Sequence, residues 1–219
     1  MIDLLGLPVG SRVLDVPCGQ GRHAHLLAEA GFRINGLDYS EHLLKVARGR
    51  GTSAALKYFR GDMRKLPSRW TGRFDAVINL FTSFGFFSNP SDDVRVIAEF
   101  VRVLRPQGVL LWHGGSRDGI MARFIARDWW ETTDGATTIA HRRSFDPLSG
   151  ILTIDSVIHR GKTRAPPIRR THRIRLYTAS RLAELCAGAG LIVEEAYDGF
   201  TCRPLSRKSS EMMLVARKQ

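Results

Sequence analysis

A glycine-rich turn near the amino terminus is the first group of residues that could do chemistry. Gly19 and Gly21 stand in the run DVPCGQG at positions 15–21. Glycine lets the backbone approach a ligand closely and adopt torsion angles that other residues avoid. A helix that begins after such a turn points its amide groups at the turn, which favours a carboxylate or a phosphate. Taken alone, the run is explained equally well by a tight turn without a ligand.

Two acidic residues follow where the second and third strands are predicted to end. Asp38 lies seventeen residues after Gly21 and could accept both hydrogen bonds of a ribose diol. Asp62 follows Gly61 and could accept from an exocyclic amine, while Met63 could lie on an adenine face. A helix-capping aspartate or an ordinary turn would explain either acid alone, but their succession favours a ligand-binding edge.

Phenylalanine side chains crowd a loop after the fourth predicted strand. Phe81, Phe84, Phe86 and Phe87 lie within nine residues that begin at Asn79. A surface turn gives little reason for four aromatic residues. The run predicts a wall for a substrate or a cofactor, with a small local core as the alternative.

The elements around these residues predict a parallel sheet. Strands are expected at 12–16, 33–37, 57–60, 74–80 and 109–113, and helices at 21–30, from Ser40 onward and at 91–104. Strands that alternate with helices are typical of a doubly wound α/β sheet covered on both faces. Ligands of such sheets bind beyond the carboxyl ends of the strands, where all four features fall.

The pattern changes after residue 113. We expect a helix at 119–126, antiparallel strands at 137–145, 151–160 and 169–177, a helix from Thr178 to Gly190, and closing strands at 191–196 and 212–216. The predicted fold is one domain over residues 1–219 with a mostly parallel seven-stranded sheet. Residues 116–177 are expected to form an inserted helix and a small antiparallel β cap. Trp129 and Trp130 would anchor this cap to the core, with the covering of an apolar substrate as the alternative.

Composition limits the class of protein. The chain has 219 residues, of which 43% are hydrophobic and 25% charged, as in ordinary globular domains. No apolar run is long enough to span a membrane, and no secretory signal is visible. Three widely spaced cysteines argue against a disulfide framework or a CxxC metal pair, so no metal site is predicted and a reducing, cytoplasmic setting fits.

The charge balance is strongly basic. The formal net charge is +12, and residues 160–175 carry seven lysine and arginine residues without an acid. Such a run is explained by a solvated pair of strands with a loop. A patch that binds phosphate or carboxylate groups is the alternative.

The strand-end features together resemble class I S-adenosylmethionine-dependent methyltransferases that act on small molecules. The matching runs are residues 13–21, 36–40, 61–64, 74–79 and 104–108. The resemblance implies a Rossmann-like methyltransferase fold and S-adenosylmethionine as cofactor, with S-adenosylhomocysteine as product. The cofactor-binding residues that it implies are Asp15, Cys18, Gly19, Gly21, Asp38, Tyr39, Asp62, Met63 and Leu80.

The loop at 81–87 and the predicted cap resemble the glycine and amino-sugar N-methyltransferases. A small-molecule acceptor is therefore expected, with nitrogen favoured over oxygen as the methylated atom. Pro17 stands where such proteins often have Ala or Gly, and His113 aligns where some have an acid. Many also carry a lid helix before the first motif, whereas this chain starts almost at the first strand. The oligomeric state is left open.

His113 is the expected general base. A methyl group on a sulfonium is already activated, so the enzyme mainly holds the acceptor in line and excludes water. An amine must be neutral to attack, and the ordinary imidazole pKa of about 6.5 suits proton removal. A buried structural histidine is the alternative reading. Tyr177 and Arg175 are expected to orient the substrate, whereas His23 and His25 are expected only to pack or to face solvent.

Three other functions compete with this interpretation. The residues GQGRHA at 19–24 fit the pattern of nicotinamide-dependent oxidoreductases, but no Tyr/Lys pair stands at a fitting spacing. A nucleic-acid methyltransferase would suit the basic charge, but Asn79-Leu80-Phe81-Thr82 lacks the prolines usual after the fourth strand of base methyltransferases. A cofactor-binding protein without catalysis is the third.

Overall fold

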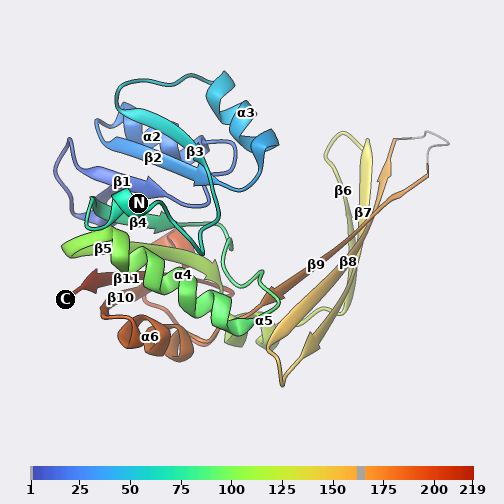
Figure 1. Ribbon diagram of the computed structural model, residues 1–219. Coiled ribbons are helices and arrows are strands. Elements are labelled where there is room, and N and C mark those ends of the chain that lie inside the picture. The colour runs from blue at the N-terminus through green and yellow to red at the C-terminus, as the bar shows by residue number, and fades with distance from the viewer. Residues whose placement is uncertain (1, 162–165) are drawn as a thin grey trace.

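The computed structural model describes residues 2–161 and 166–219, and its central feature is a seven-stranded sheet. The strand order is β10-β11-β5-β4-β1-β2-β3, in which β5, β4, β1, β2 and β3 run parallel and β11 pairs antiparallel with β5 and β10 (Figure 1). The predicted doubly wound, mostly parallel sheet is confirmed.

The strands of this sheet fall on the predicted runs. They are β1 Arg12–Asp15, β2 Arg33–Asp38, β3 Leu56–Arg60, β4 Phe74–Asn79, β5 Leu104–Gly115, β10 Leu191–Tyr197 and β11 Glu211–Lys218. β5 begins five residues earlier than predicted, because Leu104 pairs with Phe74 before the register shifts to Val109 opposite Ala76.

Helices cover both faces of the sheet. They are α1 Ile2–Leu5, α2 Arg22–Glu29, α3 Glu41–Gly49, α4 Pro90–Val103, α5 Arg117–Ala122 and α6 Ala179–Gly188, with short 3-10 helices η1 Ser68–Trp70 and η2 Gly199–Thr201. Helices α1, α2 and α3 pack on one face of the sheet through the buried side chains of Leu5, Leu27 and Leu44. Helices α4 and α6 pack on the other face through the buried side chains of Phe100 and Leu182. No helix in the described ranges is long and apolar enough to cross a membrane.

Helices α3 and α6 each begin at a side chain that caps them. The Ser40 hydroxyl accepts a hydrogen bond from the Leu43 amide at 3.3 Å, and the Thr178 hydroxyl accepts from the Arg181 amide at 3.1 Å. Each satisfies a backbone donor that has no partner inside the helix. The cap at Ser40 matters for the site, because it sets where the chain turns after β2.

The insertion is a separate antiparallel sheet of the order β6-β7-β8-β9. Its strands are β6 Arg127–Glu131, β7 Thr137–Asp146, β8 Ile151–Arg160 and β9 Ile168–Arg175. It stands out from the body on the side toward which the parallel strands point (Figure 1). The predicted small antiparallel insertion is confirmed, but β6 was not predicted and the helix before it ends at Ala122, not at residue 126.

The expected anchoring role of Trp129 and Trp130 is wrong. Both lie on β6, and they are 69% and 47% exposed. The base of the insertion is instead held by Leu152, Ile174 and Leu176, which form a small buried cluster with residues of α5. Of the basic run at 160–175, positions 162–165 lie outside the described residues.

Candidate functional site

The glycine turn joins the end of β1 to α2, as predicted. Gly19 and Gly21 have φ angles of 54° and 76°, which are left-handed values that favour glycine. A side chain at Gly21 would collide with the Tyr58 hydroxyl, so packing against β3 explains this glycine. A side chain at Gly19 would meet nothing within 4 Å. The open side of the turn therefore lies at Gly19.

Asp38 ends β2 and ties the turn to the start of α3. One carboxylate oxygen accepts from the Gly19 amide at 2.8 Å, and the other accepts from the Ser40 amide at 2.8 Å. A carboxylate has about four acceptor positions on its two oxygens. Asp38 therefore keeps acceptor capacity beyond these two bonds while it is held rigidly in place.

Two buried acceptors without a partner lie at the ends of the adjacent strands β1 and β4. They are Asp15 Oδ2 and Asn79 Oδ1, within the part of the chain that is described. The Asn79 amide group also donates to the Val16 carbonyl at 2.7 Å, which joins the ends of the two strands. Burial, and then the charge of Asp38, raise the pKa of Asp15 to about 8. Such orphaned acceptors suit a ligand that brings a cationic donor.

Asp62 and Met63, after β3, make contacts within the protein. Arg64 donates to both Asp62 oxygens, at 2.6 Å to Oδ2, and reaches Asp92 at 3.0 Å. The Arg64 hydrogen bonds lower the pKa of Asp62. Met63 packs against the core on the side of α4. An incoming adenine would share Asp62 with Arg64.

Cys18, Tyr39 and Leu80 differ in their accessibility. Cys18 is buried, and burial raises the pKa of its thiol. The Leu80 side chain is buried and its carbonyl accepts from the Ser83 hydroxyl at 2.6 Å. Tyr39 is 71% exposed beside Arg60, so among these three it is the one whose ring is free to cover a ligand.

His113, at the end of β5, has both ring nitrogens bonded. Nδ1 accepts from the Phe81 amide at 3.1 Å, which places the proton on Nε2, 3.3 Å from the Glu211 carboxylate. Burial lowers the His113 pKa, against the opposing effect of Glu211. No lone pair of the ring is free in this arrangement. The expected role of His113 as general base therefore conflicts with its contacts.

The same histidine holds a strained loop. Phe81 and Thr82 have φ angles of 56° and 57°, which are uncommon for residues other than glycine. The His113 ring accepts from the Phe81 amide, and its carbonyl accepts from the Thr82 amide at 3.1 Å. His113 thus sets the direction in which the Phe81 side chain leaves β4.

Phe81 lies at the centre of an aromatic cluster at the carboxyl edge. Its ring stacks on His23 of α2 at 4.8 Å and on Phe200 of η2 at 5.2 Å. Burial, and then the charge of Arg22, lower the pKa of His23. The predicted aromatic wall is therefore only part of the phenylalanine run, because Phe84 is buried in the core.

Tyr177 and Arg175 are bonded to a buried aspartate of α4. The Tyr177 hydroxyl donates to Asp93 Oδ2 at 2.7 Å, and Arg175 donates to the same oxygen at 2.7 Å. Asp93 is fully buried. This triad joins the end of the insertion to the main body, so the substrate-orienting role expected for Tyr177 and Arg175 conflicts with their contacts.

Three residues of this edge were missed or undervalued from the sequence. Asn79 was recognised only as part of a motif, although its position at a strand end was a usable signal. His23 was expected only to pack or to face solvent, although it lies two residues after the glycine turn. Asp93 resembles any acidic residue in the first turn of a helix, and nothing local distinguishes it.

Known proteins are similar to this chain in sequence and in fold. A family model described as a methyltransferase domain matches residues 13–108. A putative methyltransferase of Bacillus subtilis is 27% identical over 216 residues, which are 97% of this chain and 86% of that protein. A dTDP-3-amino-3,6-dideoxy-alpha-D-glucopyranose N,N-dimethyltransferase of Streptomyces fradiae is 27% identical over 85% of this chain and 72% of its own. Other relatives are named as O-methyltransferases.

The fold agrees with these matches. The structure of the CcbJ methyltransferase from Streptomyces caelestis superposes with a TM-score of 0.87 at 20% identity, covering 99% of this chain and 87% of that one. The strand order, the turn after β1 and the acid after β2 stand where the resemblance required them. The chain contains a methyltransferase domain at residues 13–108 and shares its fold with known methyltransferases.

Proposed function

We propose that this enzyme transfers a methyl group from S-adenosylmethionine to a nitrogen atom of a small molecule. The Streptomyces fradiae enzyme is named for methylating an amino group and aligns over most of both chains, whereas the relatives named as O-methyltransferases align over shorter parts. The bonded state of His113 supports the same choice. Alcohols require a strong base, whereas an amine needs to lose only its ammonium proton.

The residues at the carboxyl edge fit the cofactor. Its methionine part carries an ammonium group, and the unpartnered Asp15 and Asn79 oxygens are buried acceptors. Asp38 retains acceptor positions for ribose hydroxyls, and the open side of Gly19 leaves room for a close approach. We propose that these four residues hold the cofactor, with Asp62, Met63 and Tyr39 toward its adenosine part and with Cys18, Gly21 and Leu80 shaping the turn and the wall behind them.

When bound, S-adenosylmethionine supplies a methyl group on a sulfonium centre, which is already activated for attack. The protein then has to place a neutral amine in line with that methyl group and exclude water. The aromatic cluster of Phe81, Phe200 and His23 gives an apolar surface for this purpose. His113 is a positioning residue for this cluster, because its hydrogen bonds hold the loop that carries Phe81.

The acceptor class can be tested directly. The purified protein is incubated with S-adenosylmethionine and a panel of primary amines, amino sugars, phenols and carboxylic acids, and S-adenosylhomocysteine is quantified by mass spectrometry. We expect turnover with amines and a product whose added mass lies on nitrogen. Transfer to phenols or carboxylates, with no amine as acceptor, would contradict the proposal.

Cofactor binding is predicted to release a proton from Asp15. Its pKa of about 8 keeps it largely protonated in the free protein at pH 7, and a bound ammonium group favours the ionised form. Between pH 6 and pH 7.5 the affinity for S-adenosylhomocysteine should therefore rise by up to about tenfold per pH unit. Calorimetry in buffers of different ionisation enthalpy measures the released protons.

Two controls isolate this effect. Methylthioadenosine lacks the amino-acid part of the cofactor and should bind without proton release. Asp15→Asn should remove the release with S-adenosylhomocysteine. Equal proton release by the variant and the wild type would assign the titration to another group.

His23, and not His113, is predicted to take up the proton of the amine. Its lowered pKa keeps it neutral at pH 7, and no hydrogen bond engages its ring within the described residues. We expect His23→Ala to lower kcat at pH 7 by about a hundredfold, a typical general-base contribution. The deficit should shrink at pH 9, because solution then supplies more neutral amine.

His25→Ala is the matched control for this variant. His25 lies on the same helix, with its ring directed at the Ala47 carbonyl of α3 at 3.3 Å. Its substitution should leave the pH profile of kcat unchanged. A deficit of His23→Ala that is the same at pH 7 and pH 9 would rule out proton transfer by His23.

A further inference from the structure

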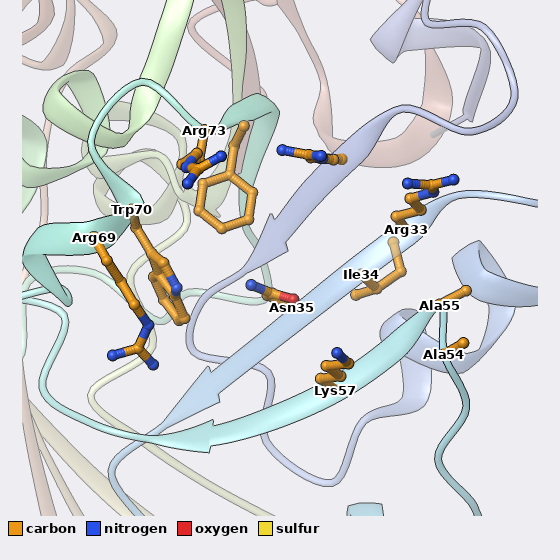
Figure 2. Close-up of a pocket in the computed structure, with 11 residues that line it drawn as sticks. Arg33, Ile34, Asn35, Ala54, Ala55, Lys57, Arg69, Trp70 and Arg73 are labelled. Carbon is orange, nitrogen blue, oxygen red and sulfur yellow. The ribbon is translucent and has the colours of Figure 1, made fainter.

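A pocket lies at the amino-terminal edge of the parallel sheet, at the opposite end of the strands from the methyl-transfer site. Its volume is about 290 Å³. Arg12, Arg33 and Phe74 are the first residues of β1, β2 and β4, and Lys57 lies near the start of β3. Arg69 and Trp70 of η1 complete the wall. Figure 2 shows Arg69 and Arg73 on one side of the pocket, Arg33 on the other, and Asn35 and Lys57 between them.

Five cationic side chains line this small pocket. They are Arg12, Arg33, Lys57, Arg69 and Arg73. All five are exposed, and none makes an ion pair or a side-chain hydrogen bond to any described residue. Arg69 alone has a ring neighbour, because its guanidinium lies 5.9 Å from the centre of Phe59. Like charges gathered in one concave site repel each other and attract counter-ions.

Acidic side chains do not neutralise this charge. The pocket lining contains no aspartate or glutamate among the described residues. Asp75 adjoins Phe74 in the chain, but one of its oxygens accepts from the Arg12 backbone amide at 2.6 Å and the other pairs with Arg105 at 2.7 Å. The side-chain charges that face the pocket are therefore left without a partner.

The floor of the pocket is polar where a parallel sheet is normally apolar. Asn35 and Lys57 stand opposite each other in the register of β2 and β3. Strands of such sheets are usually apolar on both faces, because helices cover them. Here the buried side chain of Trp70 covers the adjoining part of the pocket wall. The side-chain amide of Asn35 has no hydrogen-bond partner among the described residues. A polar floor in a parallel sheet suits a site that contacts a polar ligand.

We propose that this pocket binds a small anion that carries two or more phosphate groups. Arginine matches phosphate because its planar guanidinium can donate two parallel hydrogen bonds, and lysine adds a point charge. Five cations exceed what a single phosphate needs. The volume is near the lower end of the range for small-ligand sites, about 300–1,000 Å³, so it suits a di- or triphosphate group and not a polymer. The ligand would bind independently of S-adenosylmethionine, because the two sites lie at opposite ends of the strands.

Calorimetry with tripolyphosphate tests this assignment. We expect saturable binding of one ion per chain at 150 mM salt, where weak surface attraction is largely screened. The charge-reversed protein Arg33→Glu/Arg69→Glu should bind at least about tenfold more weakly, which is about 1.4 kcal/mol. Saturating S-adenosylhomocysteine should leave the affinity for tripolyphosphate unchanged, and thermal melting verifies that the exposed substitutions preserve the fold.

Arg170→Glu/Arg173→Glu is the matched control. Both residues are exposed on β9, and the double change alters the net charge by the same amount. It should change the affinity for tripolyphosphate by less than about twofold, which is below 0.5 kcal/mol. The pocket assignment is overturned if this control weakens binding as much as the pocket variant, or if the wild type shows no saturation. A single-stranded oligonucleotide is titrated as a comparison. If it binds the wild type more tightly than tripolyphosphate does, and the pocket variant no longer binds it, the small-anion assignment is overturned in favour of nucleic acid.

Discussion

Asp38→Ala should lower the affinity for S-adenosylhomocysteine by at least about a hundredfold. Hydrogen bonds to charged groups contribute about 1.5–3 kcal/mol each, and the carboxylate is proposed to accept from two ribose hydroxyls. The substitution also leaves the Gly19 and Ser40 amides without their acceptor, so the turn that we propose to contact the methionine part loses its support. Isothermal titration calorimetry measures the affinity, and circular dichroism melting shows whether the fold persists.

Two variants separate cofactor binding from a general loss of structure. Glu41→Ala removes an exposed acid three residues further along, which pairs with Arg48 on the surface, and it should leave the affinity unchanged. Asp38→Asn keeps the shape of the side chain but replaces one of its two acceptor oxygens by an amide donor, which then faces the backbone N–H of Gly19 or of Ser40. This variant should bind S-adenosylhomocysteine weakly, while its melting temperature stays close to that of the wild type. Wild-type affinity in Asp38→Ala would refute the assignment of this acid to the cofactor.

Asp93→Ala should be the most destabilising single substitution that we predict, at about 3–5 kcal/mol of unfolding free energy. Removing one partner of a buried ion pair leaves the other charge buried without compensation. Arg175 keeps a side-chain exposure of only 10%, and Asp93 of 0%. Burial raises the pKa of Asp93, against the bonds from Tyr177 and Arg175. Urea denaturation monitored by circular dichroism gives the free energy.

Asp92→Ala is the control, because the two aspartates are adjacent in the first turn of α4. Asp92 pairs with Arg64, whose side chain is 36% exposed, so its loss should cost no more than about 1 kcal/mol. Tyr177→Phe, which removes one hydrogen bond of the triad, should cost about 1 kcal/mol. Equal losses for Asp93→Ala and Asp92→Ala would show that the triad does not hold the insertion to the body.

The predictions from sequence were accurate where the signal is local. The caps at Ser40 and Thr178 and the buried strands follow from residue type and spacing within a few positions. Strand β6 has no such signal, because four of its five residues are exposed and it is held by pairing with β7 alone. Trp129 and Trp130 were misplaced for the same reason, since large aromatic residues are usually buried.

The sequence by itself determined the sheet, the turn of Gly19 and the acid that faces it, because each is encoded in a short run at a strand end. The tertiary structure decided the chemistry of the histidines. Both ring nitrogens of His113 are bonded, to Phe81, thirty-two residues earlier, and to Glu211, ninety-eight residues later. The ring of His23 stacks on Phe81, and it is for this reason that we propose the proton-accepting role for His23. A side chain's free lone pairs depend on neighbours that the fold brings from distant positions, and no local pattern records them.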